Sequence, residues 1–255
     1  MSRAIELPTP HDLSGVELFS GLPTSALAEV ASRARLRHLA KNARVFAQAE
    51  VAERCHALLR GRIRIAQSDE DGEQLVVRFI GPGETFGTAA LFTDHAYPAE
   101  ARAVVDSIEV SWREVDLRDL VGRYPHIALN ITRVIGSRLQ EAQQRLRELA
   151  TQRVHRRIAH ALVRLAAHVA AEKGGGSAIG FPLSRKDVAE MCGATLHTAS
   201  RVLTAWEKAG LISSTRQHVT IRKLADIRNI ADDRLEGVPA YCRGAIVRRQ
   251  ARDSK

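Results

Sequence analysis

Residues 184–210 read SRKDVAEMCGATLHTASRVLTAWEKAG, a segment with the pattern of two short helices joined by a turn. Ser184 and Asp187 have the spacing of a capping box, so a helix should begin after Ser184, with Asp in place of the usual Glu or Gln. Gly193 can adopt the positive φ of a tight turn between helices, and Thr195 is a suitable N-cap for the second helix. The stretch therefore predicts a helix-turn-helix.

The second of these helices has two different faces. The apolar face consists of Ala199, Val202, Leu203 and Trp206, and the polar face of His197, Ser200, Arg201 and Thr204. The polar face has short side chains and a single Arg, which suits a surface that reads base edges. An amphipathic helical hairpin with a solvated face is the alternative. Residues 211–222 (LISSTRQHVTIR) favour the first interpretation, because two apolar-polar runs around a polar turn predict a β-hairpin, here a wing.

Candidate base contacts lie along this polar face. Arg201 is the candidate for direct base readout, because a guanidinium can bond bidentately to O6 and N7 of guanine; a phosphate contact is the alternative. Ser200 is short enough to bond a base or a phosphate at close approach. Leu196 and His197 are placed to contact a thymine methyl group or a base edge, and for His197 a solvent-facing position is the alternative.

Phosphate contacts are expected around these residues. Thr195 and the backbone N–H groups at the start of the second helix are suited to hold a phosphate. Arg185 and Lys186, at the start of the first helix, are further candidates. So are Arg216 and His218 in the wing turn, with a solvated turn as the alternative.

Composition bounds the class of protein. The chain has 255 residues, 45% of them hydrophobic, and a formal net charge of +9, so one large or two ordinary domains and a polyanionic partner are expected. No apolar run approaches the roughly 20 residues of a membrane span, and the N-terminus lacks a secretory segment, so we expect a cytoplasmic protein without a membrane partner. Cys55, Cys192 and Cys242 are widely spaced, which argues against a disulfide framework or a thiolate cluster; Cys192 should pack at the helix-turn-helix elbow.

Upstream of the helix-turn-helix, residues 44–113 have the pattern of short strands. The β-rich runs are residues 62–66, 74–80, 101–105 and 108–112, and glycines at 61, 72, 81, 83 and 87 separate them. Many short strands between glycine turns predict a small antiparallel barrel or roll. Before the strands, a short helix should open near Pro23 or Thr24.

A long helix is predicted after the strands. Small and apolar residues recur every three or four positions along it, at Ala128, Ile131, Ile135, Leu139, Ala142, Leu146 and Leu149. Packing of this narrow seam on the chain's own roll is one interpretation. We favour burial against the same seam of a second chain, because a narrow stripe on a helix between two domains suits a twofold dimer. The expected dimer interface is Ile131, Ile135, Leu139, Ala142, Leu146 and Leu149.

These patterns predict an α+β protein in four parts. They are a β-roll over residues 1–125, a dimerisation helix over 126–150, a winged helix-turn-helix over 151–225 and a basic flexible tail over 226–255. Weak order is expected in the tail, which would add non-specific phosphate affinity or serve solubility alone; we prefer the second.

In this order, the roll, the seam helix and the winged helix-turn-helix resemble the CRP/FNR transcription regulators over about residues 20–225. Residues 61–65 (GRIRI) resemble the family's roll hairpin, residues 83–92 (GETFGTAALF) the segment with its effector-site helix, and residues 183–212 its helix-turn-helix. The resemblance implies a homodimer on a near-palindromic operator in double-stranded DNA. It also implies control by a cyclic-nucleotide-binding-like sensor domain, with RNA polymerase as a further candidate partner.

The effector region implied by this resemblance lies around Gly87, Thr88, Tyr97 and Pro98. Cyclic-nucleotide-binding members have a Glu for the ribose soon after the glycine, and this chain has Thr88 there. They also have an Arg-Ser pair for the cyclic phosphate, and this chain has Tyr97 and Pro98. Because a phosphate without a cation loses its main charge-assisted bonds, cyclic AMP is not expected as the effector.

The cofactor is unknown from the sequence. Oxygen-sensing members hold an iron–sulfur cluster on N-terminal cysteines, and no Cys precedes Cys55, so no such cluster is expected. Ser200 and Arg201 match the Ser-Arg pair of the oxygen-sensing branch, but His197 stands where a Glu is usual. The whole run 195–207 resembles the nitrogen-oxide branch, some of whose members sense nitric oxide through haem. Candidate axial ligands are His11, His38, His56, His95 and Cys55, with ordinary surface or packing roles as the alternative.

Two other classes of function compete with a DNA-binding regulator. The sequence has no P-loop, GxSxG or HExxH motif and no Cys, His and acidic cluster at metal spacing, so no motif supports an enzyme. The second rival is a cyclic-nucleotide-binding-like module that acts through protein contacts. A steep fall of DNA affinity with salt, together with a sequence preference, would argue against it.

Overall fold

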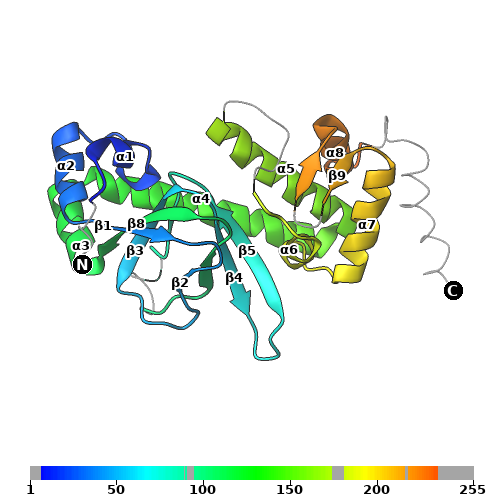
Figure 1. Ribbon diagram of the computed structural model, residues 1–255, viewed down its shortest axis with the longest axis horizontal. Helices are drawn as coiled ribbons and strands as arrows, with labels where there is room; N and C mark the ends of the chain where they lie inside the picture. The colour runs from blue at the N-terminus through cyan, green and yellow to red at the C-terminus, as the bar shows by residue number, and fades with distance from the viewer. Residues whose placement is uncertain (1–6, 89, 91–94, 174–180, 216–217, 235–255) are drawn as a thin grey trace. The chain divides into compact units, whose positions relative to one another are not determined.

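The computed structural model describes residues 7–88, 90, 95–173, 181–215 and 218–234 (Figure 1). Its backbone divides into two compact units, Met1–Gln143 and Gln144–Lys255. The first unit contains the predicted strands and the second the predicted helix-turn-helix. The long helix α4 (His126–Thr151) crosses the boundary between them.

The first unit is a β-roll of two antiparallel four-stranded sheets, with the strand orders β1-β8-β3-β6 and β2-β7-β4-β5. The strands are β1 (Arg35–Leu39), β2 (Arg44–Phe46), β3 (Arg54–Arg60), β4 (Ile63–Ser68), β5 (Gln74–Ile80), β6 (Thr85–Phe86), β7 (Glu100–Ala103) and β8 (Ser107–Arg113). The turn between β3 and β4 requires glycine, because Gly61 has a φ of +99° and a Cβ there would lie 2.8 Å from Cα of Ser107. The predicted roll is confirmed.

Short helices cover one side of the roll, where Figure 1 shows α1, α2 and α3 together. They are α1 (Pro10–Ser14), the 3₁₀ helix η1 (Glu17–Phe19), α2 (Thr24–Ser32) and α3 (Glu114–Arg123). Trp112 of β8 joins them to the sheet: its ring packs edge-to-face on Phe19 with centroids 4.8 Å apart, and its Nε1 donates to the carbonyl of Val30 at 2.9 Å. The helix predicted to open near Thr24 is confirmed as α2.

Helix α4 has one face toward its own chain and one face without cover. Ile127 is buried, and the buried Asn130 donates from Nδ2 to the carbonyls of Leu18 and Ser20 at 3.0 and 2.9 Å. Ile131 packs partly buried against the roll core, so the predicted seam begins on the chain's own roll. The rest of the seam is exposed: Ile135, Leu139, Ala142, Leu146 and Leu149. Exposure reaches 58% at Leu139 and 68% at Leu146.

The second unit has its own core. Its elements are α5 (Val154–Lys173), α6 (Arg185–Met191), α7 (Leu196–Lys208), β9 (Ile212–Ser214), β10 (Val219–Ile221) and α8 (Leu224–Ala231). Leu162, Leu203 and Trp206 are among its buried side chains, and β9 and β10 form the antiparallel hairpin predicted as a wing. Cys192 is buried at the elbow, as predicted.

The expected flexible tail does not begin at residue 226. Residues 224–231 form α8, and Ile227 and Ile230 are 0% and 1% exposed. Arg156 of α5 holds the end of α8 by donating from Nε to the carbonyl of Ala231 at 3.1 Å. The spaced apolar residues therefore add a helix to the core, while the rest of the expected tail, with Cys242, lies outside the described residues. None of the described helices combines the length and the apolar character that a membrane span requires.

Candidate DNA-binding surface and effector region

The helix-turn-helix is formed by local bonds at its three joints. The hydroxyl of Ser184 accepts from the backbone N–H of Asp187 at 3.0 Å, and the Asp187 carboxylate accepts from the backbone N–H of Ser184 at 2.9 Å. This is the predicted capping box. Gly193 has a φ of +56°, and the Oγ1 of Thr195 accepts from the N–H of Thr198 at 3.2 Å as the N-cap of α7. The predicted caps and turn are confirmed.

Helix α7 buries one face and exposes the other. Ala199, Leu203 and Trp206 are buried against the rest of the unit. The reading face, defined as Thr195, Leu196, His197, Ser200 and Arg201, is exposed except at the half-buried Ser200. In the described part of the chain, no hydrogen bond or ion pair engages the side chain of His197 or Arg201. The structure therefore leaves these two side chains available to a ligand.

The first helix contributes two basic side chains in different ways. Lys186 is 67% exposed, and its Nζ lies 3.5 Å from Oε1 of Glu190, so it is accessible to a phosphate. Arg185 instead points into its own unit: Nη1 donates to Oγ1 of Thr204 at 2.8 Å and Nη2 to Oε2 of Glu207 at 2.8 Å. A phosphate contact by Arg185 would compete with these bonds.

The wing turn is described in part. His218 is exposed, and its carbonyl accepts from the N–H of Thr215 at 2.9 Å, which closes the turn. Arg216 lies outside the described residues. The wing therefore offers His218 to the solvent, while the predicted phosphate contact at Arg216 stays a prediction.

The effector region is closely packed around Gly87. Gly87 has a φ of +72°, and a Cβ there would lie 2.9 Å from Cε1 of Tyr97 and 3.1 Å from Cδ2 of His56, so no larger residue fits. Tyr97 is 3% exposed and stacks on Phe46 with ring centroids 3.7 Å apart. Its hydroxyl donates to the carbonyl of Arg54 at 2.7 Å, and burial raises the pKa of Tyr97 to about 12.

The other two residues of the expected effector region, Thr88 and Pro98, differ in their exposure to solvent. Thr88 is buried, and its Oγ1 lies 3.3 Å from Sγ of Cys55. Pro98 is exposed, and its carbonyl accepts from Nε2 of Gln67 at 3.0 Å. Tyr97, which stands where the resemblance implies the Arg of cyclic-nucleotide-binding members, places a buried ring without positive charge in this region.

A buried charged network lies beside this region, and the sequence reasoning missed it. Glu109 of β8 is fully buried, with Oε1 2.5 Å from Nδ1 of His56 and Oε2 2.6 Å from Nε of Arg37. A carboxylate accepts only, so Nδ1 of His56 carries the proton. Burial lowers the pKa of His56. Burial alone would raise the pKa of Glu109, but the bonds from His56 and Arg37 hold it below its usual value.

The sequence pattern of β8 does not reveal this network. In β8, Glu109 and Ser111 alternate with Val110 and Trp112, and all four are buried. A strand with polar residues on one face usually turns that face to water, so the alternation alone predicts an exposed Glu109. Only the partners on β1 and β3 make its burial tolerable.

The candidate haem ligands do not fit an axial role in the described residues. Both ring nitrogens of His56 are engaged, one with Glu109 and the other 3.1 Å from the hydroxyl of Tyr97. Burial raises the pKa of the Cys55 thiol to about 12, which disfavours the thiolate that binds a metal. His11, His38 and His95 are exposed. A haem would require this core to rearrange.

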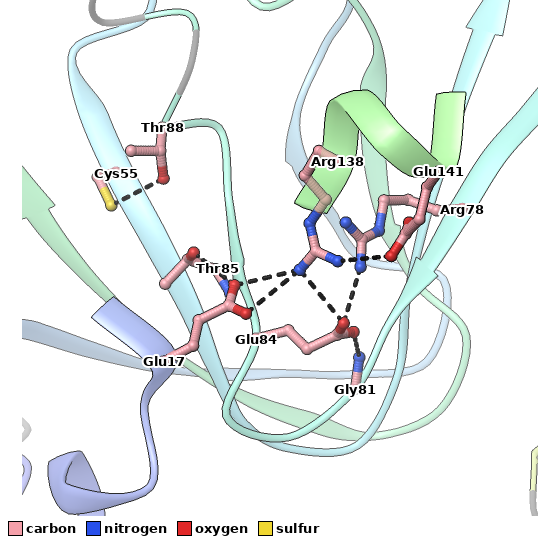
Figure 2. Close-up of polar contacts among 9 residues, drawn as sticks. All are labelled: Glu17, Cys55, Arg78, Gly81, Glu84, Thr85, Thr88, Arg138 and Glu141. Carbon is pink, nitrogen blue, oxygen red and sulfur yellow. Dashed lines mark hydrogen bonds and ion pairs between the residues drawn. The ribbon is translucent and has the colours of Figure 1, made fainter. Parts of the chain in front are cut away.

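A second charged cluster joins α4 to the turn before the effector region. Figure 2 shows the guanidinium of Arg138 directed at the carboxylates of Glu17 and Glu84. Glu84 also accepts from Nη2 of Arg78 at 2.7 Å and from the N–H of Gly81 at 2.6 Å. Glu17 in turn accepts from the N–H and hydroxyl of Thr85, both at 2.8 Å. The cluster therefore connects α4 with residues 81–85, which lead through β6 to Gly87.

Comparison with known proteins agrees with this geometry. A cyclic nucleotide-binding domain matches residues 36–124, and a Crp-like helix-turn-helix domain matches residues 156–230. The CRP-like cAMP-activated global transcriptional regulator of Mycobacterium tuberculosis is 24% identical over 209 residues, covering 82% of this chain and 93% of that protein. The nitrogen fixation regulation protein FixK of Rhizobium meliloti is 32% identical over 169 residues, which cover 66% of this chain and 74% of that protein. The structure of FixK2 from Bradyrhizobium japonicum has the same fold, with a TM-score of 0.67 at 21% identity over 77% of this chain and 96% of that chain.

Proposed function

Because the chain belongs to the CRP/FNR family of transcription regulators, we propose that it is a homodimer that reads a near-palindromic operator in double-stranded DNA with the reading face of α7. Its relatives are transcription regulators and not enzymes. The single observation that carries the proposal is the reading face itself, where Arg201 and His197 are exposed without partners in the described chain. Its place of action would be the cytoplasm, with the DNA.

The homodimer is supported by the uncovered half of α4. Ile135, Leu139 and Leu146 are 45%, 58% and 68% exposed, and they follow one another at the spacing of a coiled-coil seam. Large apolar side chains aligned along one helix are costly in water, and a second copy of the same helix would bury them by twofold symmetry. Such a dimer would present two reading faces to the two halves of a palindrome.

The sensor domain is proposed to control this binding through the region around Gly87 and Tyr97. The buried ring of Tyr97 and the neutral Thr88 supply no cation for a cyclic phosphate, which supports an effector other than cyclic AMP. The likeness of residues 195–207 to the nitrogen-oxide branch bears on the operator, because those residues lie on α7. It does not bear on the signal, which is received by the roll.

Selection of duplexes from a random pool by the full chain tests the DNA-binding proposal. We expect a palindrome whose half-sites are about one helical turn apart, and an affinity whose logarithm falls linearly with the logarithm of salt concentration. Equal binding to selected and random duplexes, or no dependence on salt, would instead support a module that acts through protein contacts.

A visible absorption spectrum tests the sensor half of the proposal. The purified protein, as isolated and with added haemin, is expected to show no sharp Soret band at one haem per chain, with or without nitric oxide. A stoichiometric band that shifts with nitric oxide and changes operator affinity would contradict it. In that case the core around His56 must open to admit the group.

A further inference from the structure

The guanidinium of Arg185 donates hydrogen bonds to several groups of its own unit. From the start of α6, its Nη1 donates to the carbonyl of Ser200 at 3.2 Å and to Oγ1 of Thr204 at 2.8 Å. Its Nη2 donates to Oε2 of Glu207 at 2.8 Å and lies 3.4 Å from Oγ of Ser214 on β9. The hydroxyl of Ser214 also donates to Oε1 of Glu207. One guanidinium therefore joins α6, two turns of α7 and the wing.

These hydrogen bonds restrict movements of α7 and the wing that apolar packing alone would permit. Ala189 of α6 and Ala199 of α7 are both buried, and the packing of such small apolar residues is non-directional. A planar guanidinium with four acceptors has one geometry, and its bond to Glu207 is charge-assisted. Because the carbonyl of Ser200 is one of the acceptors, the clamp acts on the residue that precedes Arg201. It therefore opposes rotation of α7 about its axis and movement of the wing.

We propose that Arg185 is a positioning residue for base recognition: with Glu207 and Ser214 it holds the reading face of α7 and the wing in one orientation. This role replaces the phosphate contact expected from the sequence, because the guanidinium is already occupied by protein acceptors. The inference rests on the proposed DNA-binding function. It adds the contacts that orient α7 for sequence-specific binding.

A positioning residue and a phosphate contact leave different signatures in binding. Loss of one phosphate contact weakens specific and random DNA equally and lowers the salt slope by about 0.9. Loss of a positioning residue weakens the selected operator more than random DNA, since phosphate contacts remain while base contacts are displaced. The salt slope then stays as in the unchanged protein.

The test compares Arg185→Gln, Glu207→Ala, the double variant and Lys186→Ala in the full chain, on the selected operator and on a random duplex at several salt concentrations. Arg185→Gln and Glu207→Ala should each lower the operator-to-random ratio by about tenfold, the discrimination of one bidentate base contact. The double variant should lose no more than either single variant, because both break one clamp. The exposed Lys186, one residue from Arg185, is the control: its variant should lose equally on both duplexes and lower the slope.

Each outcome decides between the two roles. A lowered salt slope for Arg185→Gln, with Glu207→Ala binding like the unchanged protein, would overturn the proposal and restore the phosphate contact. If Arg185→Gln does not fold, Arg185→Lys carries the test, because it keeps the charge and loses the planar fork: reduced specificity supports the clamp, and full specificity overturns it. If the unchanged protein itself prefers no sequence, the proposed function fails and this inference fails with it; if the unchanged protein prefers a sequence and Arg185→Gln keeps that preference in full, this inference alone is overturned.

Discussion

Nη2 of Arg138 lies 3.3 Å from Oε1 of Glu84, so the first half of α4 is bonded to the turn that leads into β6 and Gly87 (Figure 2). The same Nη2 lies 3.2 Å from Oε1 of Glu17, which holds the next residue of that segment, Thr85. Side chains of this cluster are only partly exposed: 25% for Arg138 and 19% for Glu84. Ion pairs therefore link residues 81–85 directly to α4, the helix whose seam is proposed to form the dimer.

Replacing Arg138 tests how much this connection stabilises the roll. Arg138→Gln should lower the free energy of unfolding of the first unit by about 1 kcal/mol, because two partly shielded carboxylates lose a shared cation. Urea unfolding followed by Trp112 fluorescence in a Trp206→Phe background would measure it. Arg118→Gln is the control, since Arg118 is 59% exposed and, among the residues that the structure describes, its ion pair is with Glu114 on its own helix. Equal effects of the two substitutions would show that the ion pairs of Arg138 stabilise the roll no more than an exposed ion pair does.

Arg201 is expected to read a base. Arg201→Ala should weaken binding to the selected operator by about 1–3 kcal/mol and relax the preference at one base position of each half-site. Competition with operators substituted at each position would identify the base. Equal losses on operator and random DNA would make Arg201 a phosphate contact.

The exposed seam of α4 is expected to hold the dimer together. Leu139→Lys combined with Leu146→Lys should give a monomer with poor operator affinity, because four charges would face one another across a twofold seam. Sedimentation measures the mass, and the matched control is Leu75→Lys with Val115→Lys, two exposed apolar residues on β5 and α3. A Leu139, Leu146 variant that still sediments as a dimer would place the interface elsewhere.

The buried network of His56 and Glu109 makes the stability of the roll depend on pH. Burial lowers the pKa of His56 in the folded state, so below about 6.5 the unfolded chain binds a proton that the folded chain does not. The pKa of Glu109 is also lowered, which adds a loss of the same sign at lower pH. The free energy of unfolding should therefore be highest above the unfolded pKa of His56 and fall as pH falls through the range below it.

His56→Gln separates this contribution from the rest of the titration. The variant should be less stable at neutral pH and should lose less stability between about pH 6.5 and 5, because its side chain takes up no proton. Urea midpoints from Trp112 fluorescence, measured across that range, provide the comparison. A variant with the same slope as the unchanged protein would assign the pH dependence to other groups.

Several parts of the structure were predictable because their causes lie within a few residues of one another. The capping box pairs Ser184 with Asp187, three residues apart, and Thr195 caps α7 through Thr198, also three apart. The period of the apolar residues, which is local too, predicted the strands, the seam of α4 and the two faces of α7. The apolar positions 227 and 230 have the same kind of spacing, but the polar residues around them favour a tail over the helix α8 that the structure shows.

Neighbouring residues alone are enough to predict where the helices of the DNA-binding unit begin and turn, and which side chains α7 exposes. Which charged residues are available to a ligand depends instead on contacts between distant parts of the chain: Arg185 is bound to Glu207, 22 residues away, and His56 to Glu109, 53 residues away. The physical reason is that a cap or an apolar period is fixed by nearest neighbours along a helix. The role of a charged side chain depends on which distant groups the fold brings within hydrogen-bond distance, and Arg185 and Lys186 show that adjacent residues can differ completely in this respect.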